Sequence, residues 1–215
     1  METDNLSVMR YEYVSAMGEE LGSVFFALHH EVIYLGIVWQ QYMQLYGNSA
    51  ENINTLNQTA GLFFKVIQNE LWDSVLLQIA ALTDPATIKG KKNITLLALP
   101  ALVQDPVMRG EIQKLCDLAL CETEYAREHR NKRIAHNDHD YHVVREAVCL
   151  SGISRTKVEE MLIAIRNVLK YVQHKIRDVD FLYDRFIDES GAALLLRKLK
   201  NSSEVLSCNR RASPI

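Results

Sequence analysis

Apolar side chains recur every three or four residues in four long stretches of the chain, and this is the spacing of one face of an α-helix. The stretches cover 24–46, 62–82, 106–125 and 158–176. No part of the sequence shows the alternation of apolar and polar residues that is typical of a half-buried β-strand. The sequence therefore predicts an all-α fold, an up-and-down bundle of four long helices.

Residues at the ends of these stretches predict where the helices begin and end. TLNQ at 55–58 resembles a capping box, and TDP ends the second stretch at Pro85. Asp105 precedes a proline at the first position of the third helix, and Ser154 precedes the fourth. We expect both side chains to act as N-caps.

Shorter elements complete the predicted architecture. The segment 86–104 contains glycine and proline, so we expect a loop with one short helical turn near 96–99. A short helical addition is expected at 192–200, and 201–215 is polar without an apolar stripe. The chain is therefore expected to form one domain over residues 1–200, followed by a flexible C-terminal tail.

Composition narrows the range of functions. Lys and Arg number 24 against 27 Asp and Glu, so the net charge is −3 and any binding to nucleic acid must be local. Four cysteines without a C-x-x-C pair, together with the acidic start METDNLS, favour a reduced, cytoplasmic protein. The apolar run 21–43 is interrupted by His29, His30 and Glu31, so we expect a buried helix and no membrane partner.

One stretch, YAREHRNKRIAHNDHDYH at 125–142, has a composition that core packing does not explain. Apolar side chains are scarce, and four of the seven histidines lie here. Its histidine, basic and acidic members are His129, His136, His139, His142, Arg127, Arg130, Lys132, Arg133, Glu128, Asp138 and Asp140. The stretch has three interpretations: a solvated helix end, a metal site, or a site that handles phosphate.

Two of these interpretations follow from residue type alone. Cations gather at a helix C-terminus because they offset the negative end of the macrodipole, which accounts for Arg127, Lys132 and Arg133. It accounts less well for the polar residues from 136 onward, yet this interpretation stays open. The His and Asp side chains are competent metal ligands, but no H-E-x-x-H or Cys/His spacing typical of zinc occurs. We therefore expect no metal and no cofactor.

The third interpretation rests on the order of residues in RNKRIAH at 130–136. This sequence resembles the R-[N/H]-x4-H motif of the HEPN superfamily, all-α domains in which the motif is the active site of metal-independent ribonucleases. NELWDSVLLQIAALTD before it and SGISRTKVEEMLIAIRNVL after it are similar to the flanking helices of the AbiU-type abortive-infection branch. The resemblance covers about residues 10–180. It implies a homodimer that cleaves RNA in antiviral defence or as a toxin, with a cognate antitoxin as a further partner.

The chemistry of metal-free RNA cleavage gives roles to three residues of the motif. The reaction requires a base for the 2′-hydroxyl proton, a cation for the phosphorane and an acid for the leaving 5′-oxygen. His136 is the expected base or acid, because an unperturbed histidine has a pKa of about 6.5. Arg130 is the expected phosphate clamp, and Asn131 would orient either partner by hydrogen bonding.

Neighbouring residues supply secondary candidates. Side chains that could bind RNA by stacking or by phosphate contact are Lys132, Arg133, Arg127 and Tyr125. Glu70 and Asp73 lie one turn apart on the second predicted helix and could hold Arg130, although a solvated helix face also explains them.

The spacing of the motif constrains its geometry. Six residues at about 100° each place Arg130 and His136 roughly 120° apart around an unbroken helix, so they cannot both face one phosphate. Either the helix ends near Ile134 or a second chain completes the site, and the dimer implied by the resemblance fits the second case. The alternative function is a non-catalytic, dimeric module in which the same cluster binds RNA or another protein.

Overall fold

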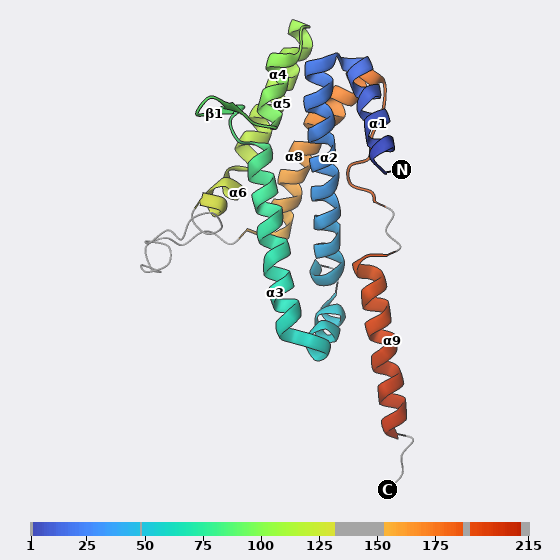
Figure 1. The fold of residues 1–215 in the computed structure, drawn as a ribbon. Helices are drawn as coiled ribbons and strands as arrows, with labels where there is room; N and C mark the ends of the chain where they lie inside the picture. The colour runs from blue at the N-terminus through green and yellow to red at the C-terminus, as the bar shows by residue number, and fades with distance from the viewer. Residues whose placement is uncertain (1, 48, 132–152, 187–189, 212–215) are drawn as a thin grey trace, which may run out of the picture. The chain divides into compact units, whose positions relative to one another are not determined.

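The computed structural model describes residues 2–47, 49–131, 153–186 and 190–211, and side chains between residues 5 and 202 of these ranges. Nearly all of the described chain is helical, as Figure 1 shows. In chain order the elements are α1 (Glu2–Met17), α2 (Glu19–Tyr42), the π-helix η1 (Met43–Gly47), α3 (Ala50–Leu82), β1 (Thr87–Ile88), β2 (Lys91–Lys92), the 3-10 helix η2 (Leu96–Ala98), α4 (Leu99–Leu102), α5 (Pro106–Glu122), α6 (Glu124–His129), α8 (Arg155–Arg177) and α9 (Ala192–Arg211). The predicted all-α class is confirmed.

The four predicted long helices correspond to α2, α3, α5 and α8. The Asp105 carboxylate accepts hydrogen bonds from the backbone N–H groups of Val107 at 2.7 Å and Met108 at 3.1 Å. The Ser154 hydroxyl accepts one from the backbone of Lys157 at 3.1 Å. Both predicted N-caps are confirmed, and each satisfies N–H groups that have no partner within the helix.

The predicted start of the second helix was wrong. α3 begins at Ala50, where the Ser49 hydroxyl accepts a hydrogen bond from the first turn at 3.0 Å. Thr55 lies inside the helix, since its hydroxyl donates to the Glu51 carbonyl one turn earlier at 3.0 Å. Ala60 has non-helical backbone angles (φ −159°, ψ 67°), which kink α3 there.

The sequence patterns did not predict α1, which carries no apolar stripe. Gly18, with φ +82°, makes the turn between α1 and α2. The two helices then approach closely at Gly22, where a Cβ atom would lie 2.6 Å from the Cα of Val14. Tyr13 is buried, and its hydroxyl accepts a hydrogen bond from Gln173 of α8 at 2.9 Å. The close approach at Gly22, the buried hydrogen bond to Tyr13 and the contacts of Arg177 with Tyr13 and Glu12 thus hold α1 in place of a broad apolar face.

The described contacts divide the chain into two compact units. The first unit comprises residues 1–35 and 76–184, and the second comprises 36–75 and 185–215. The division falls within α2 and within α3. The expectation of one folding domain over residues 1–200 stays a prediction.

In the first unit, α5 and α8 pack against each other. Ile112 and Cys116 of α5 and Met161 and Ile165 of α8 are fully buried. Burial of each large aliphatic side chain stabilises the fold by roughly 1.5–3 kcal/mol. The packed pair of α5 and α8 therefore supports the segments that follow α3 and α5 in the chain.

A polar pair is buried in the same unit. The side chains of His29 and Tyr183 are both buried, with 2.8 Å between the histidine Nδ1 and the tyrosine oxygen. The Phe181 ring packs edge-on to the imidazole, with ring centroids 4.7 Å apart. Burial, with smaller contributions from His30 and Arg177, lowers the pKa of His29 to about 4. The imidazole is therefore neutral at neutral pH.

The core of the second unit is aromatic. Trp39 stacks on Tyr42 with ring centroids 5.4 Å apart, and Tyr42 lies 5.2 Å from Trp72 of α3. The Tyr46 hydroxyl donates a hydrogen bond of 2.8 Å to the Phe64 carbonyl. These contacts join the end of α2 and η1 to α3.

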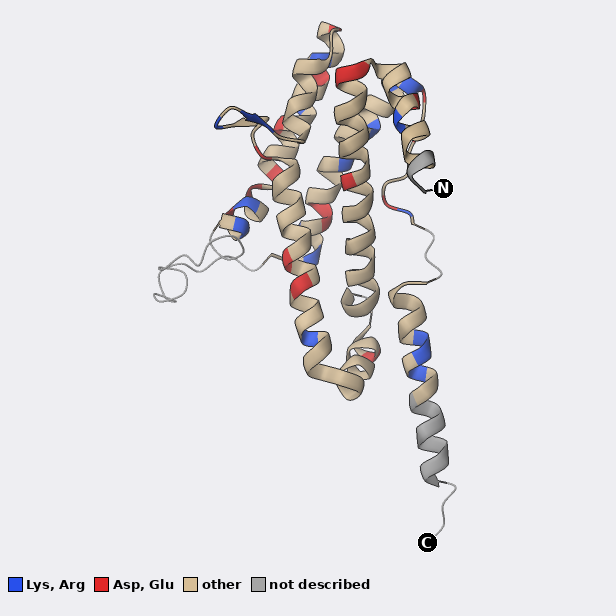
Figure 2. Cartoon of the chain, viewed as in Figure 1, with Lys and Arg blue, Asp and Glu red and all other residues tan. Residues whose placement is uncertain are grey.

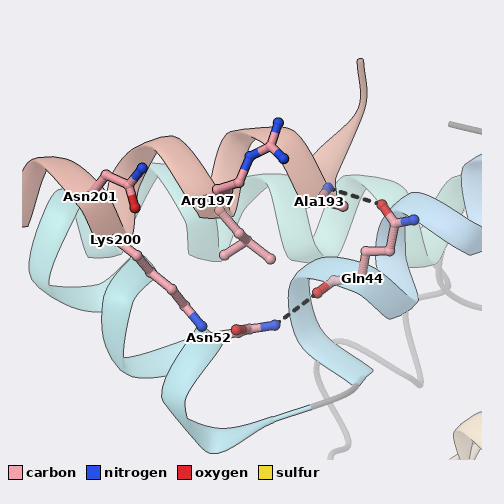
Figure 3. A pocket seen from close by; sticks show the side chains of 7 residues that line it. Gln44, Asn52, Ala193, Arg197, Lys200 and Asn201 are labelled. Atoms are coloured by element: carbon pink, nitrogen blue, oxygen red, sulfur yellow. Dashed lines mark hydrogen bonds between the residues drawn. The ribbon is translucent and has the colours of Figure 1, made fainter. Parts of the chain in front are cut away.

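Two glutamine side chains cap the beginning of α9 in the second unit. The Gln41 and Gln44 side-chain oxygens accept hydrogen bonds from the backbone N–H groups of Ala192 at 2.6 Å and Ala193 at 3.0 Å. Figure 3 shows the second of these bonds beside an open hollow of about 430 Å³. The hollow is lined by Gln44, Asn52, Ala193, Leu196, Arg197, Lys200 and Asn201.

The C-terminal helix is longer than the sequence predicted. α9 continues to Arg211, whereas a short helix was expected to end at residue 200. An ion pair of 2.8 Å between Lys200 and Glu51 ties α9 to α3. The expectation of a flexible C-terminal tail at 201–215 stays a prediction.

The segment 19–47 is long and apolar enough to cross a membrane by length and composition, and it is the one such helix among the described residues. Half of its most apolar window is buried inside the protein. Phe25, Leu28, Val32 and Leu35 are all fully buried or nearly so. α2 thus packs as a core helix, as its interruption by polar residues predicted.

Candidate functional site

The candidate site begins at the junction of α5 and α6. Thr123 separates the two helices, and its hydroxyl donates to the Ala119 carbonyl at 2.7 Å. The same hydroxyl oxygen lies 2.9 Å from that of Thr83, which follows the end of α3. Both threonines are fully buried. The end of α3 is therefore fixed against the start of α6.

Arg127 stabilises this junction by hydrogen bonds. Its Nη1 donates to the hydroxyl oxygens of Thr123 at 2.8 Å and Thr83 at 3.1 Å, and its Nη2 donates to the Leu120 carbonyl at 2.7 Å. Burial lowers the pKa of Arg127, although an arginine stays protonated at any physiological pH. The described contacts of Arg127 are internal to the protein, so its geometry favours anchoring α6 over the RNA contact suggested by its position in the sequence.

Arg130 follows α6 and forms an ion pair with Asp84. Its Nη1 donates to both carboxylate oxygens of Asp84 at 2.6 Å, and the two side chains are each only 20% exposed. Its Nε donates to the side-chain oxygen of Asn131 at 3.1 Å. Arg130 is therefore held by hydrogen bonds to Asn131, its neighbour in RNKRIAH, and to Asp84, which lies far from it in the sequence.

Asp84 was missed by sequence reasoning, which used TDP only as the signal that ends α3. The carboxylate that contacts Arg130 is Asp84, and neither Glu70 nor Asp73 takes this role. The backbone of Asp84 is held as well, because the Thr95 hydroxyl lies 2.7 Å from the Asp84 carbonyl oxygen. The sequence shows an acidic residue two positions after the end of α3, but no local signal links it to the motif.

The ion pair fixes the direction of the Arg130 guanidinium. Nε and Nη1 are engaged by Asn131 and Asp84, and no described residue accepts a hydrogen bond from Nη2. A guanidinium held in this way can present its remaining N–H groups to a phosphate oxygen. At longer range, however, the Asp84 charge offsets the arginine charge, so the pair alone attracts an anion weakly.

The remaining predicted residues divide into two groups. Asn131 is exposed, and Tyr125 is 38% exposed on α6, so both are accessible. Lys132, Arg133 and His136 lie outside the described residues, as does the proposed end of the helix near Ile134. The predicted 120° separation therefore stays a prediction.

The metal interpretation depends on clusters of His, Cys, Asp or Glu side chains. Among residues 5–131, 153–186 and 190–202, no group of three or more His, Cys, Asp or Glu side chains could hold a metal ion. The His and Asp residues between 136 and 142 lie outside those ranges, so the metal interpretation of that cluster is not tested by this geometry.

Comparison with known proteins identifies the chain at the family level. The family model HEPN_AbiU2, described as AbiU2, matches residues 18–192. The chain belongs to the HEPN_AbiU2 family. This match confirms the resemblance found from the sequence, and it includes both Asp84 and the RNKRIAH segment. No curated protein and no solved structure matches the chain.

Membership of the HEPN_AbiU2 family also bears on the fold. The matched range begins at Gly18, just before α2, and ends at the first residue of α9, so it includes the predicted helices that flank the motif. α1 and most of α9 lie outside it. Both residues of the ion pair between Asp84 and Arg130 lie within the matched range.

Proposed function

We propose that this HEPN_AbiU2 chain is a metal-independent endoribonuclease that acts in phage defence or as a toxin. The observation that carries the proposal is the Arg130 guanidinium, which is held by Asp84 and Asn131 at the start of a sequence with the HEPN motif. A fixed arginine suits phosphoryl transfer, because transition-state charge is stabilised best by groups that need no reorganisation.

In the proposed reaction, the 2′-oxygen of the substrate attacks the adjacent phosphorus while a base takes the 2′-hydroxyl proton. The bond from phosphorus to the 5′-oxygen breaks, and an acid protonates that oxygen. His136 is proposed as base or acid, and Arg130 donates hydrogen bonds to the phosphate oxygens. The products are a 2′,3′-cyclic phosphate and a 5′-hydroxyl end.

We further propose that two copies of the chain form a homodimer in which Arg130 of one copy serves His136 of the other. The reason is the angular separation expected between these residues on a continuous helix. A cognate antitoxin would then act by binding one copy or by blocking the dimer. Lys132, Arg133 and Tyr125 remain proposed contacts to RNA beside the motif.

One observation favours a second function, a non-catalytic module that binds RNA or protein. Asp84 occupies part of the Arg130 guanidinium and neutralises it, as expected where an arginine serves only to stabilise the fold. The same basic cluster would then contact a partner without chemistry.

Incubation of the purified protein with total RNA in EDTA distinguishes the two functions. Cleavage that persists in EDTA, leaves 2′,3′-cyclic phosphate ends and falls roughly 100- to 10,000-fold in His136→Ala supports the ribonuclease. Cleavage that requires a divalent ion, or that leaves 3′-hydroxyl ends, would contradict the proposed mechanism. RNA retention without cleavage would assign the chain to the binding module.

A further inference from the structure

A cationic hairpin begins directly after Asp84. Strands β1 and β2 pair in antiparallel fashion, with Thr87 opposite Lys92 and Ile88 opposite Lys91. The segment 85–94 contains three lysines and no acidic residue, and Lys89, Lys91 and Lys92 are all exposed. Figure 2 shows Lys colouring along this hairpin. In a chain with a net charge of −3, this is a concentrated positive patch.

The base of the hairpin is tied to the candidate site. The Asn93 backbone N–H donates to the Ala86 carbonyl at 2.9 Å, and the Asn93 side chain donates to the Pro85 carbonyl at 2.7 Å. Asp84, which precedes Pro85, is held as well, because the Thr95 hydroxyl donates to its carbonyl oxygen at 2.7 Å. The lysines therefore project from a base that includes the residue holding Arg130.

Core packing does not explain the hairpin. All four strand residues are exposed, and a two-stranded hairpin is at best marginally stable by itself. The turn is also costly, since its central residues Lys89 and Gly90 have φ values of +49° and +79°. Two positive φ values are typical of a type I′ turn, where asparagine or glycine is the preferred first residue. A lysine is kept at a position that disfavours it.

Among the described residues of the site, neither arginine offers an uncompensated charge to RNA. Arg130 is neutralised by Asp84, and the described hydrogen bonds of Arg127 are internal. Affinity for RNA depends largely on cations that contact phosphates. Exposed lysines anchored beside Asp84 supply such cations.

We propose that the hairpin at 85–94 binds backbone phosphates of a single-stranded RNA beside the phosphate held by Arg130, with Lys89, Lys91 and Lys92 as the contacts. This inference rests on the proposed function for its choice of RNA. It gives the hairpin a role in affinity without sequence preference, because lysine contacts to phosphates do not distinguish bases.

The test compares two triple variants with the same net charge. One replaces Lys89, Lys91 and Lys92 with Gln. The control replaces three exposed lysines on α3, α8 and α9 with Gln: Lys65, Lys175 and Lys198. The probe is a fluorescein-labelled single-stranded RNA with 2′-O-methyl groups, which this mechanism cannot cleave, and affinity is measured by fluorescence anisotropy at several salt concentrations.

The hairpin variant should bind at least about tenfold more weakly at low salt than wild type, and the control should bind nearly as wild type does. Each phosphate contact to a single strand contributes about 0.7 to the slope of log affinity against log salt, so the slope should fall by about 2. A variant with Arg at the three hairpin positions should bind like wild type, since it keeps the charge.

Lys89→Asn separates charge from backbone strain. Asparagine tolerates the positive φ of this turn, so the melting temperature should be unchanged or raised. The affinity for RNA should nevertheless fall by about two- to fivefold, because one phosphate contact is lost. A lysine that only stabilises the turn would give the opposite pattern, with lower stability and unchanged affinity.

Equal affinities of the hairpin variant and the control would overturn the proposal. Displacement of the labelled RNA by polyglutamate as readily as by unlabelled RNA would overturn it too, by assigning the hairpin to an acidic protein. If the hairpin variant cleaves ordinary RNA as well as wild type does, the ribonuclease proposal is supported and the role of the hairpin is rejected. Binding that requires the hairpin, without any cleavage, would support the hairpin and reject the ribonuclease.

Discussion

Asp84→Asn tests whether the ion pair positions Arg130. The substitution keeps the size of the side chain and one acceptor oxygen but leaves the arginine charge uncompensated. Exposed ion pairs contribute roughly 0–1 kcal/mol, and breaking a buried pair costs about 3–5 kcal/mol. Both partners are one-fifth exposed at 2.6 Å, so we expect a loss of about 2 kcal/mol in the free energy of unfolding. For a chain of this size, that lowers the melting temperature by about 4–8 °C.

The same substitution should lower the cleavage rate more than it lowers binding. A catalytic group displaced by about 1 Å can cost on the order of 100-fold in rate, so we expect the single-turnover rate constant to fall about 10- to 100-fold. RNA affinity should stay equal or rise, because a negative charge is removed beside the site. Glu70→Gln is the matched control, since it removes an exposed carboxylate from α3.

Three results would refute this reasoning. An Asp84→Asn protein with the rate and melting temperature of wild type would show that the ion pair positions nothing. Equal losses in Asp84→Asn and Glu70→Gln would point to net charge in place of local geometry. A faster Asp84→Asn protein would show that the carboxylate restrains Arg130 from phosphate.

Three further predictions follow from the dimer, the buried histidine and the C-terminal helix. A doubly tagged mixed dimer of Arg130→Ala and His136→Ala should regain part of the activity that each parent lacks; if it forms and stays inactive, the working pair lies within one chain or all four residues are required. His29 has a folded pKa below its unfolded value of 6.5, so stability is highest above about pH 6.5 and falls as the pH drops toward 4, by on the order of 3 kcal/mol. Urea unfolding at pH 7 and pH 4.5 should show this slope in wild type and a shallower one in His29→Gln. Deletion of 201–215 should leave the melting temperature nearly unchanged, because the described contacts that tie α9 to its neighbours precede residue 201; a drop above about 5 °C would contradict this.

Helix positions were predictable because apolar periodicity and caps are local signals. Asp105 and Ser154 each satisfy N–H groups two or three residues away, and a local rule therefore finds both. α1 was missed because a close approach at Gly22 and polar contacts of Tyr13 with Gln173 and Arg177 of α8 hold it, and neither leaves a periodic pattern. The start of α3 was missed because the Thr55 hydroxyl is satisfied equally well inside a helix.

The candidate site was predictable in its residue types but not in its partners. Arg130 and Asn131 were found from the motif, whereas Asp84 lies 46 residues earlier and is brought to Arg130 only by the packing of α3 against the junction of α5 and α6. The i, i+3 spacing that suggested Glu70 and Asp73 is a rule about one helix. It says nothing of which turn of that helix meets the motif.

The segment between Thr83 and Thr95 shows how a short stretch can serve fold and site together. Thr83 accepts a hydrogen bond from Arg127 and fixes the start of α6. The next residue, Asp84, holds Arg130, which lies three residues after Arg127. Thr95 closes the segment, with its hydroxyl oxygen 2.9 Å from the Leu82 carbonyl and 2.7 Å from that of Asp84. A turn fixed at both ends can carry an exposed, strained hairpin between them, because the hairpin need not contribute to the core. The three lysines of the turn and β2 therefore contribute little to the core, and a phosphate-binding role explains their presence better than stability does.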